Sequence, residues 1–454
     1  MAIYAVAKLG GICNMVHAQT PAAALRENMA FTESDILITY LPDCTGTAKT
    51  TLFVDLSHHM GLFYRAGFRL KSRSRRPAGV RPFEAMERGC ETKAVLPEQG
   101  SLAEKCAVYF HSSGTTGTPK TVMHCHEALN NSVESSFENY FLLDAKGKNI
   151  LSILPLYHGS GLVKDLHLGL SGGGQITLMA KWDCDLAVKW IKKQKITNIA
   201  GVPAIFWALL KNDRFSRSDL QQCYVGGDRV GEGIKLAFLE RTGIPLLENY
   251  GLTETVSICC GERVIEGRIF GMSPYPGYTI SILSSDNIPT PHGTGELIIS
   301  CNTMMMGYLN DSAATEDALT NRNERVWIRT GDVGTIDDNG HIHFLDRLKR
   351  IIIHNGYNVY PQEVESVIAA LPEVEDVCAF GSYDDQKHTQ IVCACVVLAK
   401  GTEKNEANAR INAECEKELP HYAIPRRLYF VGQLPRNDMS KVSMEKLEEL
   451  LREV

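Results

Sequence analysis

Short apolar, strand-like runs alternate with longer helix-like stretches through the first half of the chain. This alternation restricts the possible folds more than any other feature. The strand-like runs occupy residues 36–40, 107–111, 150–154, 176–179, 196–200, 222–225 and 245–247. Parallel strands need a crossover connection between them, and that connection is usually a helix. The alternation therefore predicts an α/β fold class with a mostly parallel sheet.

The pattern of apolar runs and turn-forming residues changes twice further along the chain. Between residues 280 and 344 the apolar runs shorten and turn-forming residues multiply, which predicts a small β-rich module. After Asp346 the pattern is that of a compact α+β unit of about a hundred residues. We therefore predict a large N-terminal domain at residues 1–346 and a small C-terminal domain at residues 347–454.

Local signals predict individual elements at both ends of the chain. The first ten residues have the pattern of the last turns of an amphipathic helix that is closed by Gly10-Gly11. Because this helix begins at Met1 without a cap or a preceding strand, we expect the domain to lack its opening segment. The elements predicted after Asp346 are a strand at 347–354, a turn at 355–356, a helix from Pro361, strands at 376–380 and 391–398, and a final helix.

Composition and charge exclude several classes of protein. With 44% hydrophobic and 22% charged residues, the chain has the balance of a globular protein. Its net charge is −6, and we interpret the one dense basic cluster, residues 71–76, as a solvated loop rather than a nucleic-acid surface. The sequence contains neither a signal peptide nor an apolar run long enough to span a bilayer, so we expect a cytoplasmic protein.

The 14 cysteines do not have the spacing of a zinc site, because their closest pairs are Cys259-Cys260 and Cys393-x-Cys395. We expect reduced, buried thiols, and the alternation in the second pair predicts one face of a strand. The sequence His124-Cys125-His126 has metal-binding residue types. No further ligand cluster lies nearby in the sequence, which favours an ordinary strand-to-helix junction.

The stretch HSSGTTGTPK at residues 111–120 has the residue types that hold phosphate. Its spacing nearly matches a Walker A motif, but Pro119 removes a backbone N–H, and Thr121 starts a strand-like run where a helix should start. We therefore predict a hairpin-like loop whose hydroxyls, glycine amides and Lys120 grip a triphosphate from the side. A flexible polar turn, the alternative, would not require all of these residue types together.

This loop resembles the phosphate-loop signature of the adenylate-forming (AMP-binding) enzymes, a superfamily of acyl-CoA synthetases, peptide adenylation domains and firefly-type luciferases. Seven further segments resemble the family's motifs in the expected order: LPLYHGSG (154–161), VGGDRV (225–230), ENYGLTET (248–255), GELII (295–299), RTGDVG (329–334), DRLKRIIIHNGYNVYPQEVE (346–365) and LPRNDMSK (434–441). The resemblance implies a large N-terminal domain hinged to a small mobile one. It also implies an acyl-CoA synthetase, a ligase that activates a carboxylic acid with ATP, releases pyrophosphate and passes the acyl group from AMP to coenzyme A.

The resemblance assigns catalytic roles to three residues. Lys441 would bridge the substrate carboxylate and the α-phosphate, where a cation is needed because two anions meet. Thr253 would contact the phosphates, and Glu254 would bind Mg²⁺, which is satisfied by one or two carboxylates plus phosphate oxygens. Ser440 replaces the family's usual Gly, so the loop before Lys441 should be stiffer. Without the resemblance, Lys441 would be one more exposed lysine before a terminal helix.

The resemblance also implies the nucleotide contacts. Tyr250 would stack on adenine, Asp332 would accept hydrogen bonds from both ribose hydroxyls, and Arg347 would add a ribose or phosphate contact. The backbone at 226–228 would line the adenine pocket, where a side chain would collide with the base. The full set predicted for ATP and AMP is Ser113, Gly114, Thr115, Thr116, Gly117, Lys120, Gly226, Gly227, Asp228, Asn249, Tyr250, Gly251, Thr253, Asp332, Arg347 and Lys441.

Three residues near the predicted domain boundary receive roles in domain rotation and CoA binding. Lys349 matches the hinge about which the small domain would turn between half-reactions. Gly356 would approach the pantetheine arm of CoA, because a residue without Cβ lets the backbone come close, and Tyr357 would bind CoA beside it. Without the resemblance, Asn355-Gly356 is a tight turn. Asp346 stands where the family usually has Gly.

The acyl substrate is predicted from LPLYHGSG. Amino-acid-activating members usually carry FDxS there, and with His158 in place of that Asp no counter-ion remains for an ammonium group. We therefore predict a short, medium or aromatic carboxylic acid, because the bulk of Met272 would shorten the pocket. The predicted acyl-pocket residues are Tyr157, His158, Val202, Gly226, Gly251 and Met272.

Alternatives to the CoA ligase stay open at this point. The accepting thiol could belong to the phosphopantetheine of a carrier protein, because both thiols would arrive through the same tunnel. The missing opening segment could leave an inactive protein that binds nucleotide or acyl groups. A luciferase-like oxygenation is not required by any motif, and a homodimer is neither indicated nor excluded.

Overall fold

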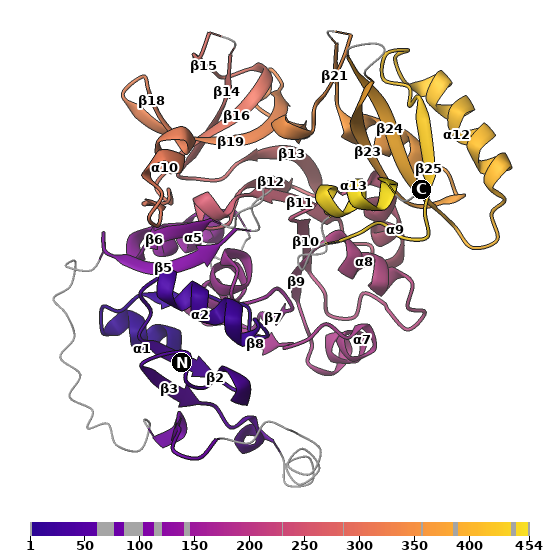
Figure 1. Ribbon diagram of the computed structural model, residues 1–454. Coiled ribbons are helices and arrows are strands. Elements are labelled where there is room, and N and C mark those ends of the chain that lie inside the picture. The colour runs from indigo at the N-terminus through magenta and orange to yellow at the C-terminus, as the bar shows by residue number, and fades with distance from the viewer. Residues whose placement is uncertain are drawn as a thin grey trace.

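The computed structural model describes residues 2–60, 77–85, 103–112, 120–139, 146–228, 230–284, 286–355, 357–384, 389–436 and 442–452. Its centre is a seven-stranded sheet in the order β13-β12-β11-β10-β9-β7-β8 (Figure 1). The strands are β7 (Asn149–Ser152), β8 (Gln175–Leu178), β9 (Asn198–Gly201), β10 (Gln222–Gly226), β11 (Leu246–Gly251), β12 (Ile258–Ile265) and β13 (Arg268–Pro274). The run from β8 to β11 is parallel, which confirms the predicted α/β sheet.

Helices cover both faces of this sheet, as a parallel sheet requires. One face packs against α7 (Cys184–Lys193), α8 (Pro203–Leu210) and α9 (Glu232–Thr242), and the other against α5 (His126–Asn139), the π-helical turn η3 (Ser160–His167) and α6 (Leu168–Ser171). Local sequence sets the helix starts, because the Asp183 side chain caps α7 and Pro203 opens α8. The carboxyl ends of β9, β10 and β11 therefore meet at one edge, where open α/β sheets bind ligands.

A second, smaller sheet carries the predicted phosphate loop. It runs in the order β1 (Cys13–Asn14), β5 (Cys106–His111), β6 (Thr121–Cys125) and β17 (Gly307–Tyr308). Strands β5 and β6 are antiparallel, with His111 opposite Thr121. The residue after Lys120 thus enters a strand, as predicted, and not the helix that a Walker A loop would require.

The N-terminal residues form a small unit of helices and parallel strands. Its elements are α1 (Ala2–Lys8), α2 (Ala22–Phe31), β2 (Ile36–Thr39), β3 (Thr50–Phe53) and β4 (Arg81–Pro82). The helix predicted for the first ten residues is therefore present. The basic cluster at 71–76 lies outside the described residues.

The predicted β-rich module is an antiparallel sheet in the order β15-β14-β16-β19-β18, with β20 paired to β19. Its strands are β14 (Tyr278–Leu283), β15 (Pro289–Thr290), β16 (Gly293–Cys301), β18 (Leu319–Arg322), β19 (Arg325–Ile336) and β20 (Ile342–Arg347), and α10 (Ser312–Ala318) precedes β18. In the β19–β20 pair Asp332 lies opposite Arg347. The sheet thereby places two predicted nucleotide residues side by side.

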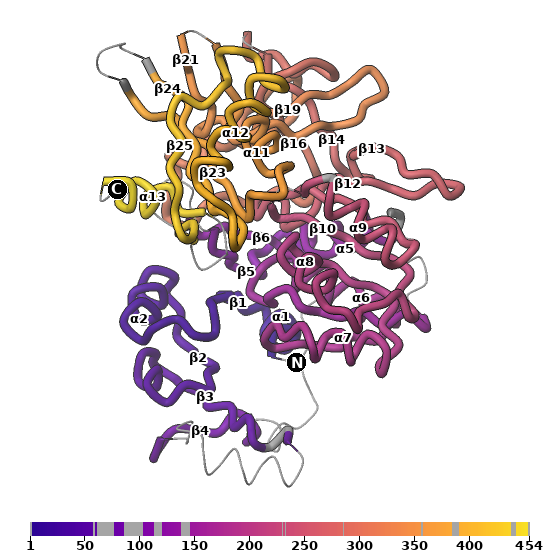
Figure 2. The backbone as a smooth tube through the Cα atoms, turned by 90° about the vertical axis from the view of Figure 1, so that its right-hand side faces the viewer, coloured from indigo at the N-terminus to yellow at the C-terminus, as the bar shows by residue number. Residues whose placement is uncertain are grey.

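The C-terminal residues form the α+β unit drawn from orange to yellow in Figure 2. Its elements are η5 (Leu348–Arg350), β21 (Ile352–His354), β22 (Tyr357–Val359), α11 (Pro361–Ala369), β23 (Val374–Asp384), β24 (Thr389–Leu398), α12 (Lys404–Glu418), β25 (Arg427–Phe430) and α13 (Met444–Arg452). The helix from Pro361, the two long strands and the last helix are as predicted. The domain boundary at residue 346 stays a prediction.

The strand predicted at 347–354 is wrong in its first half. Residues Leu348–Arg350 form a 3₁₀ turn, and only Ile352–His354 pair as a strand. The chain has to leave the β19–β20 sheet after Arg347 and reverse into a hairpin, and a tight turn makes that change of direction.

Cys393 and Cys395 lie on one face of a strand, as their alternation in the sequence predicts. Cys393 and Cys395 belong to one hydrophobic core cluster, and Ala394 between them belongs to another cluster on the opposite face of β24. All cysteines of the described residues are free thiols. Strand β6 ends at Cys125 and α5 begins at His126, as the junction interpretation of His124-Cys125-His126 requires. Within the described ranges no helix is long and apolar enough to cross a membrane.

Candidate active site

Three predicted nucleotide residues from three separate motifs meet at one point. The Tyr250 hydroxyl at the end of β11 donates to Oδ2 of Asp332 at 2.6 Å, and Arg347 Nε lies 3.0 Å from Oδ1 of the same carboxylate. Asp332 is fully buried, whereas the side chain of Arg347 is 37% exposed. Burial, together with the Asp332 charge, raises the pKa of Tyr250 well above its ordinary value, so its hydroxyl stays a donor.

The phosphate side of the site is built around Glu254. Its Oε1 accepts a hydrogen bond from the Tyr308 hydroxyl at 2.8 Å, and the ammonium of Lys120 lies 4.4 Å from the centre of the Tyr308 ring. Burial and the Glu254 carboxylate raise the pKa of Tyr308, which keeps its proton for this bond. Lys120 and Glu254, predicted from motifs 134 positions apart, are thus joined through Tyr308.

Tyr308 was not predicted from the sequence. It is 8% exposed, lies on β17 and follows Gly307, whose φ of 140° is open to glycine alone among ordinary residues. The Gly-Tyr pair, which forms the short strand β17, was the available signal. That signal does not indicate which carboxylate the phenol reaches.

A buried histidine holds the turn that carries Thr253 and Glu254. His124 on β6 is completely buried, and its Nε2–H donates to the backbone oxygen of Thr253 at 2.7 Å. Burial is the main reason that the pKa of His124 falls to about 4, and the bond to Thr253 opposes the shift only in part. His124 is thus a neutral support for the turn at Thr253. No group of three or more metal-ligating side chains occurs in the part of the chain that the structure describes.

The backbone at the ends of β10 and β11 leaves no room for side chains. A Cβ added to Gly226 would lie 2.4 Å from the Asn249 carbonyl oxygen, and one added to Gly251 would lie 2.1 Å from that of Ser257. Gly227 has φ of 78°, and with Asp228 it is exposed at the strand end. The packing of the neighbouring strands thus requires glycine at 226 and 251, and the adenine pocket at residues 226–228 stays a prediction.

Aromatic side chains line the predicted acyl segment. The Tyr157 ring lies 4.5 Å from the His158 ring and meets the edge of the His17 ring at 4.9 Å, measured between centroids. Val202 lies close to the same edge of the sheet, because a Cβ on Gly227 would be 3.6 Å from its Cγ1. His17 was not singled out from the sequence. It comes from the N-terminal unit, far from Tyr157 along the chain.

Two predicted residues point into the core. The Asn249 side chain accepts a hydrogen bond from the Tyr275 hydroxyl at 2.9 Å, and Met272 is 9% exposed within the core cluster that also holds Tyr275. Asn249 thus has a structural partner. That Met272 shortens an acyl pocket stays a prediction.

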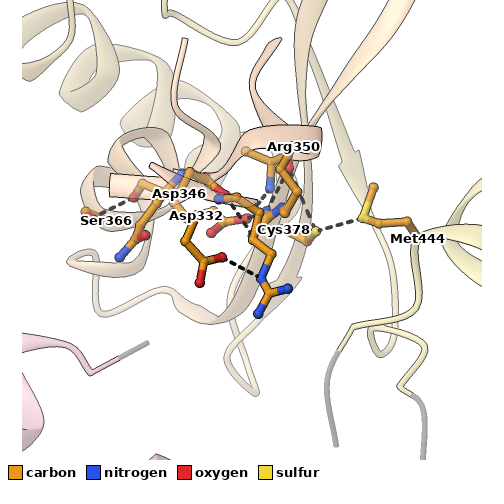
Figure 3. Close-up of polar contacts among 10 residues, drawn as sticks. Asp332, Asp346, Arg350, Ser366, Cys378 and Met444 are labelled. Carbon is orange, nitrogen blue, oxygen red and sulfur yellow. Dashed lines mark hydrogen bonds and ion pairs between the residues drawn. The ribbon is translucent and has the colours of Figure 1, made fainter. Parts of the chain in front are cut away.

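A buried polar cluster surrounds the predicted hinge (Figure 3). Asp346 accepts from the backbone N–H of Arg347 at 2.7 Å and from that of Gln362, in the first turn of α11, at 2.9 Å. Arg350 reaches Asp346 at 3.8 Å and Glu365 of α11 at 2.5 Å. Lys349, the predicted hinge residue, is exposed beside this cluster.

Of the residues predicted to bind CoA only Tyr357 is among the described residues, and the predicted catalytic lysine, Lys441, lies outside them. Tyr357 is 55% exposed, and its ring stacks on Tyr422 at 4.5 Å between centroids and 7° between planes. The predicted residues outside the described ranges are Ser113, Gly114, Thr115, Thr116, Gly117, Gly356 and Lys441. The ends of the phosphate loop are joined, because Ser112 N–H donates to the Lys120 carbonyl oxygen at 2.9 Å.

Comparison with known proteins identifies the class that this fold and site define. The family model described as AMP-binding enzyme matches residues 1–309, and the model of its C-terminal domain matches residues 363–441. The chain belongs to the AMP-binding enzyme family. It is 30% identical over 364 residues to 4-coumarate–CoA ligase 3 of Oryza sativa subsp. japonica, covering 75% of this chain and 63% of that protein.

Two further matches extend over nearly the whole chain. A long-chain-fatty-acid–CoA ligase of Escherichia coli O6:H1 is 28% identical over 426 residues, which is 92% of this chain and 73% of that protein. The crystal structure of ATP-bound MatB from Rhodopseudomonas palustris superimposes with a TM-score of 0.82 at 24% identity, covering 99% of this chain and 86% of that one. The chain thus spans about two thirds to three quarters of the length of these two curated ligases.

Proposed function

We propose that the chain is an AMP-forming acid–thiol ligase that activates a carboxylic acid with ATP and transfers the acyl group to coenzyme A. The observation that carries this proposal is the meeting of Tyr250, Asp332 and Arg347 within hydrogen-bond distance. Glu254 follows Tyr250 by four positions, which supports a phosphate site next to the proposed ribose site. The names of the similar ligases support the same activity.

In the first half-reaction a carboxylate oxygen of the acid bonds to the α-phosphorus of ATP. The bond from that phosphorus to the bridging oxygen breaks, and pyrophosphate leaves with the electron pair. Asp332 and Arg347 hold the ribose and thereby fix the α-phosphate, and Lys120 lies where it can contact the outgoing phosphates. Lys441, outside the described residues, is proposed to neutralise the two anions as they meet.

In the second half-reaction the CoA thiolate attacks the acyl carbon, and the bond from that carbon to the AMP phosphate oxygen breaks. We propose that residues 347–454 turn about Lys349 between the two steps, so that Lys441 leaves and the face with Tyr357 arrives. Arg350 and Asp346 beside Lys349 form the contacts that such a rotation would have to rearrange.

The residues around Glu254 fit Mg²⁺ better than a transition metal. A single carboxylate beside a phosphate site is the ligand set that Mg²⁺ accepts, because phosphate oxygens and water complete its shell. When bound, the cation would neutralise phosphate charge and orient the pyrophosphate that leaves. Tyr308 keeps the Glu254 carboxylate in place through its hydroxyl.

For the acid, we propose a short, medium or aromatic carboxylic acid. His158 and Tyr157 offer no carboxylate for an ammonium group, which argues against amino acids. The similar ligases are named for 4-coumarate and for long-chain fatty acids, so both branches belong in a test. Faster turnover of palmitate than of butyrate, hexanoate, benzoate or 4-coumarate would contradict this choice.

The activity is tested by ATP–pyrophosphate exchange with this panel of acids, followed by AMP release with and without CoA. We expect acid-dependent exchange, and AMP release that CoA accelerates. Acceleration by a phosphopantetheinylated carrier protein instead of CoA would identify the other acceptor. Saturable ATP binding without exchange for any acid would mean a binding protein.

The role of Lys441 is tested by Lys441→Ala. The variant should lose exchange but still form thioester from supplied acyl-adenylate and CoA. Lys446→Ala, which removes an exposed lysine of α13, is the matched control and should retain both steps. Equal loss of both half-reactions in Lys441→Ala would show that the change unfolds the small domain.

A further inference from the structure

The strand that carries Asp332 contains an irregularity at that residue. In the β16–β19 pair, Glu296 lies opposite Val333 and Ile298 lies opposite Arg329. Between these two pairs β16 has only Leu297, whereas β19 has Thr330, Gly331 and Asp332. Strand β19 therefore bulges away from β16, and bulges beside active sites commonly redirect a side chain.

Glu296 bonds both sides of this bulge. Its Oε1 accepts the Gly331 N–H at 3.1 Å, and its Oε2 accepts from Arg329 Nε at 3.1 Å and Nη2 at 2.7 Å. The Gly331 N–H is thus paired by a side chain, and its φ of 67° is a conformation that suits glycine. Glu296 is 9% exposed, so its charge is compensated mainly by these donors.

The Thr330 side chain holds the bulge through two further hydrogen bonds. Its hydroxyl donates to the Leu297 carbonyl oxygen at 2.6 Å, and it accepts the Asp332 N–H at 3.0 Å. The backbone of Asp332 is therefore fixed at the residue whose carboxylate reaches Tyr250 and Arg347.

We propose that Glu296 is a positioning residue for the nucleotide, because it clamps the β19 bulge in the conformation that directs Asp332 toward the ribose. This inference rests on the proposed function, in which Asp332 binds the ribose hydroxyls. The hydrogen bonds of Glu296 itself go to Gly331 in the bulge and to Arg329. Loss of the Glu296 charge should therefore weaken the binding of ATP more than the binding of nucleotides that lack one ribose hydroxyl.

The experiment compares the dissociation constants of ATP, 2′-deoxy-ATP and 3′-deoxy-ATP by calorimetry. In the wild type, loss of one charge-assisted hydrogen bond should weaken binding about 30-fold. Glu296→Gln keeps the shape but loses the charge that holds Arg329. It should reduce the preference for ATP over the deoxy nucleotides by about fivefold or more, and it should weaken the deoxy forms less than ATP, because each of them has only one hydroxyl bonded to Asp332. Asp332→Ala should remove the preference and mask any further effect of Glu296→Gln.

Glu365→Gln is the matched control, because Glu365 is another buried glutamate paired with an arginine, away from the bulge. It should leave the preference for ribose unchanged. If Glu296→Gln fails to fold, Thr330→Val tests the same clamp and should also lower the preference. Equal loss of ATP and deoxy-ATP affinity in Glu296→Gln or Thr330→Val, or no loss, would overturn the clamp.

The outcomes separate the clamp from the proposed function. A wild type that prefers ATP over the deoxy forms, but shows no exchange with any acid, overturns the ligase and leaves the clamp standing. A wild type that exchanges but has no preference for ribose overturns the clamp and leaves the ligase standing. A wild type that binds no adenine nucleotide overturns both.

Discussion

Asp332 and Asp346 lie on the neighbouring strands β19 and β20, and both carboxylates are buried, but their partners are of different kinds. Asp332 is held by two side chains, the Tyr250 hydroxyl and the Arg347 guanidinium. Asp346 is held by two backbone N–H groups, those of Arg347 and Gln362, with Arg350 farther away. Since Arg347 lies opposite Asp332, the adjacent Asp346 points to the other side of the sheet.

This difference indicates which carboxylate can accept a substrate. A side-chain partner can rotate away when a ribose hydroxyl arrives, whereas a backbone N–H can leave only if the chain itself moves. Asp332 is therefore suited to ligand exchange. Asp346 is suited to fixing the N-terminus of α11 against β20, where a negative charge is favourable to the helix. The predictions below test this division between an exchangeable and a structural carboxylate.

The largest effect should come from Asp332→Ala. The change removes the two charge-assisted hydrogen bonds that we propose between Asp332 and the ribose, each contributing about 2 kcal/mol, so kcat/KM for ATP in the exchange reaction should fall about 10³-fold. Asp346→Ala is the control, and its KM for ATP should stay within about threefold of the wild type. A loss below about tenfold in Asp332→Ala would mean that the ribose does not use this carboxylate.

The next largest effect should come from acid, which should destabilise the region around His124 on β6 before the region around Glu365 at the hinge. The pKa of His124 is about 4 in the folded protein and near 6.5 when unfolded, so the unfolded state binds the proton first. Its contribution is complete above pH 6.5 and is lost as the pH falls toward 4, a loss of about 3 kcal/mol. At the hinge, burial raises the pKa of Glu365 in spite of Arg350, so that protonation of Glu365 does not favour unfolding.

This prediction is measured by urea unfolding at several pH values between 7 and 4.5, with hydrogen exchange followed for β6 and for β23. Protection of β6 should fall with pH before that of β23. His124→Asn is the control, because an amide donates to Thr253 without titrating, and its unfolding free energy should depend less on pH. An unchanged pH dependence in this variant would assign the acid sensitivity to other groups.

Asp346→Ala should have a moderate effect, and on stability rather than on nucleotide use. It removes the carboxylate that accepts hydrogen bonds from the backbone N–H groups of Gln362 and Arg347, at a cost of about 2 kcal/mol. Thermal unfolding should show the loss, and Asp346→Asn, which keeps one acceptor oxygen, should lose about half as much. Because the contact to α11 crosses the proposed hinge, the ratio of thioester formation to adenylation should also change. An unchanged ratio would show that Asp346 does not restrain the rotation.

The sequence predicts one of these two carboxylates and not the other. Asp332 was assigned from the RTGD segment, and the alternation of apolar runs predicted the parallel sheet whose edge carries Tyr250. Asp346 was noticed only as a departure from the family's usual Gly. Its capping of α11 depends on where α11 packs against β20, and no local pattern encodes that position.

The same limit applies to the contacts that complete the site. The Tyr308–Glu254 bond and the Glu296 clamp join segments far apart in sequence, and both depend on the register of strand pairs. Periodicity shows that a strand has two faces, but it does not show which residue lies opposite which. The bulge opposite Leu297 therefore becomes visible only in the structure.

The smallest expected effect tests exchangeability most directly. Tyr250→Phe keeps the ring that would stack on adenine and removes the hydroxyl that occupies Asp332 in the nucleotide-free protein. In the free protein Oδ2 then loses its bond to the phenol, and the ribose no longer has to displace that phenol, so ATP should bind about threefold more tightly. Thermal stability should fall by about 1 kcal/mol for the same reason. Calorimetric titration with ATP measures the first effect, and Tyr250→Ala, which also removes the ring, should instead weaken binding about tenfold or more. If Tyr250→Phe binds ATP about tenfold more weakly, the phenol stays on Asp332 in the complex, and the partners of Asp332 are as fixed as those of Asp346.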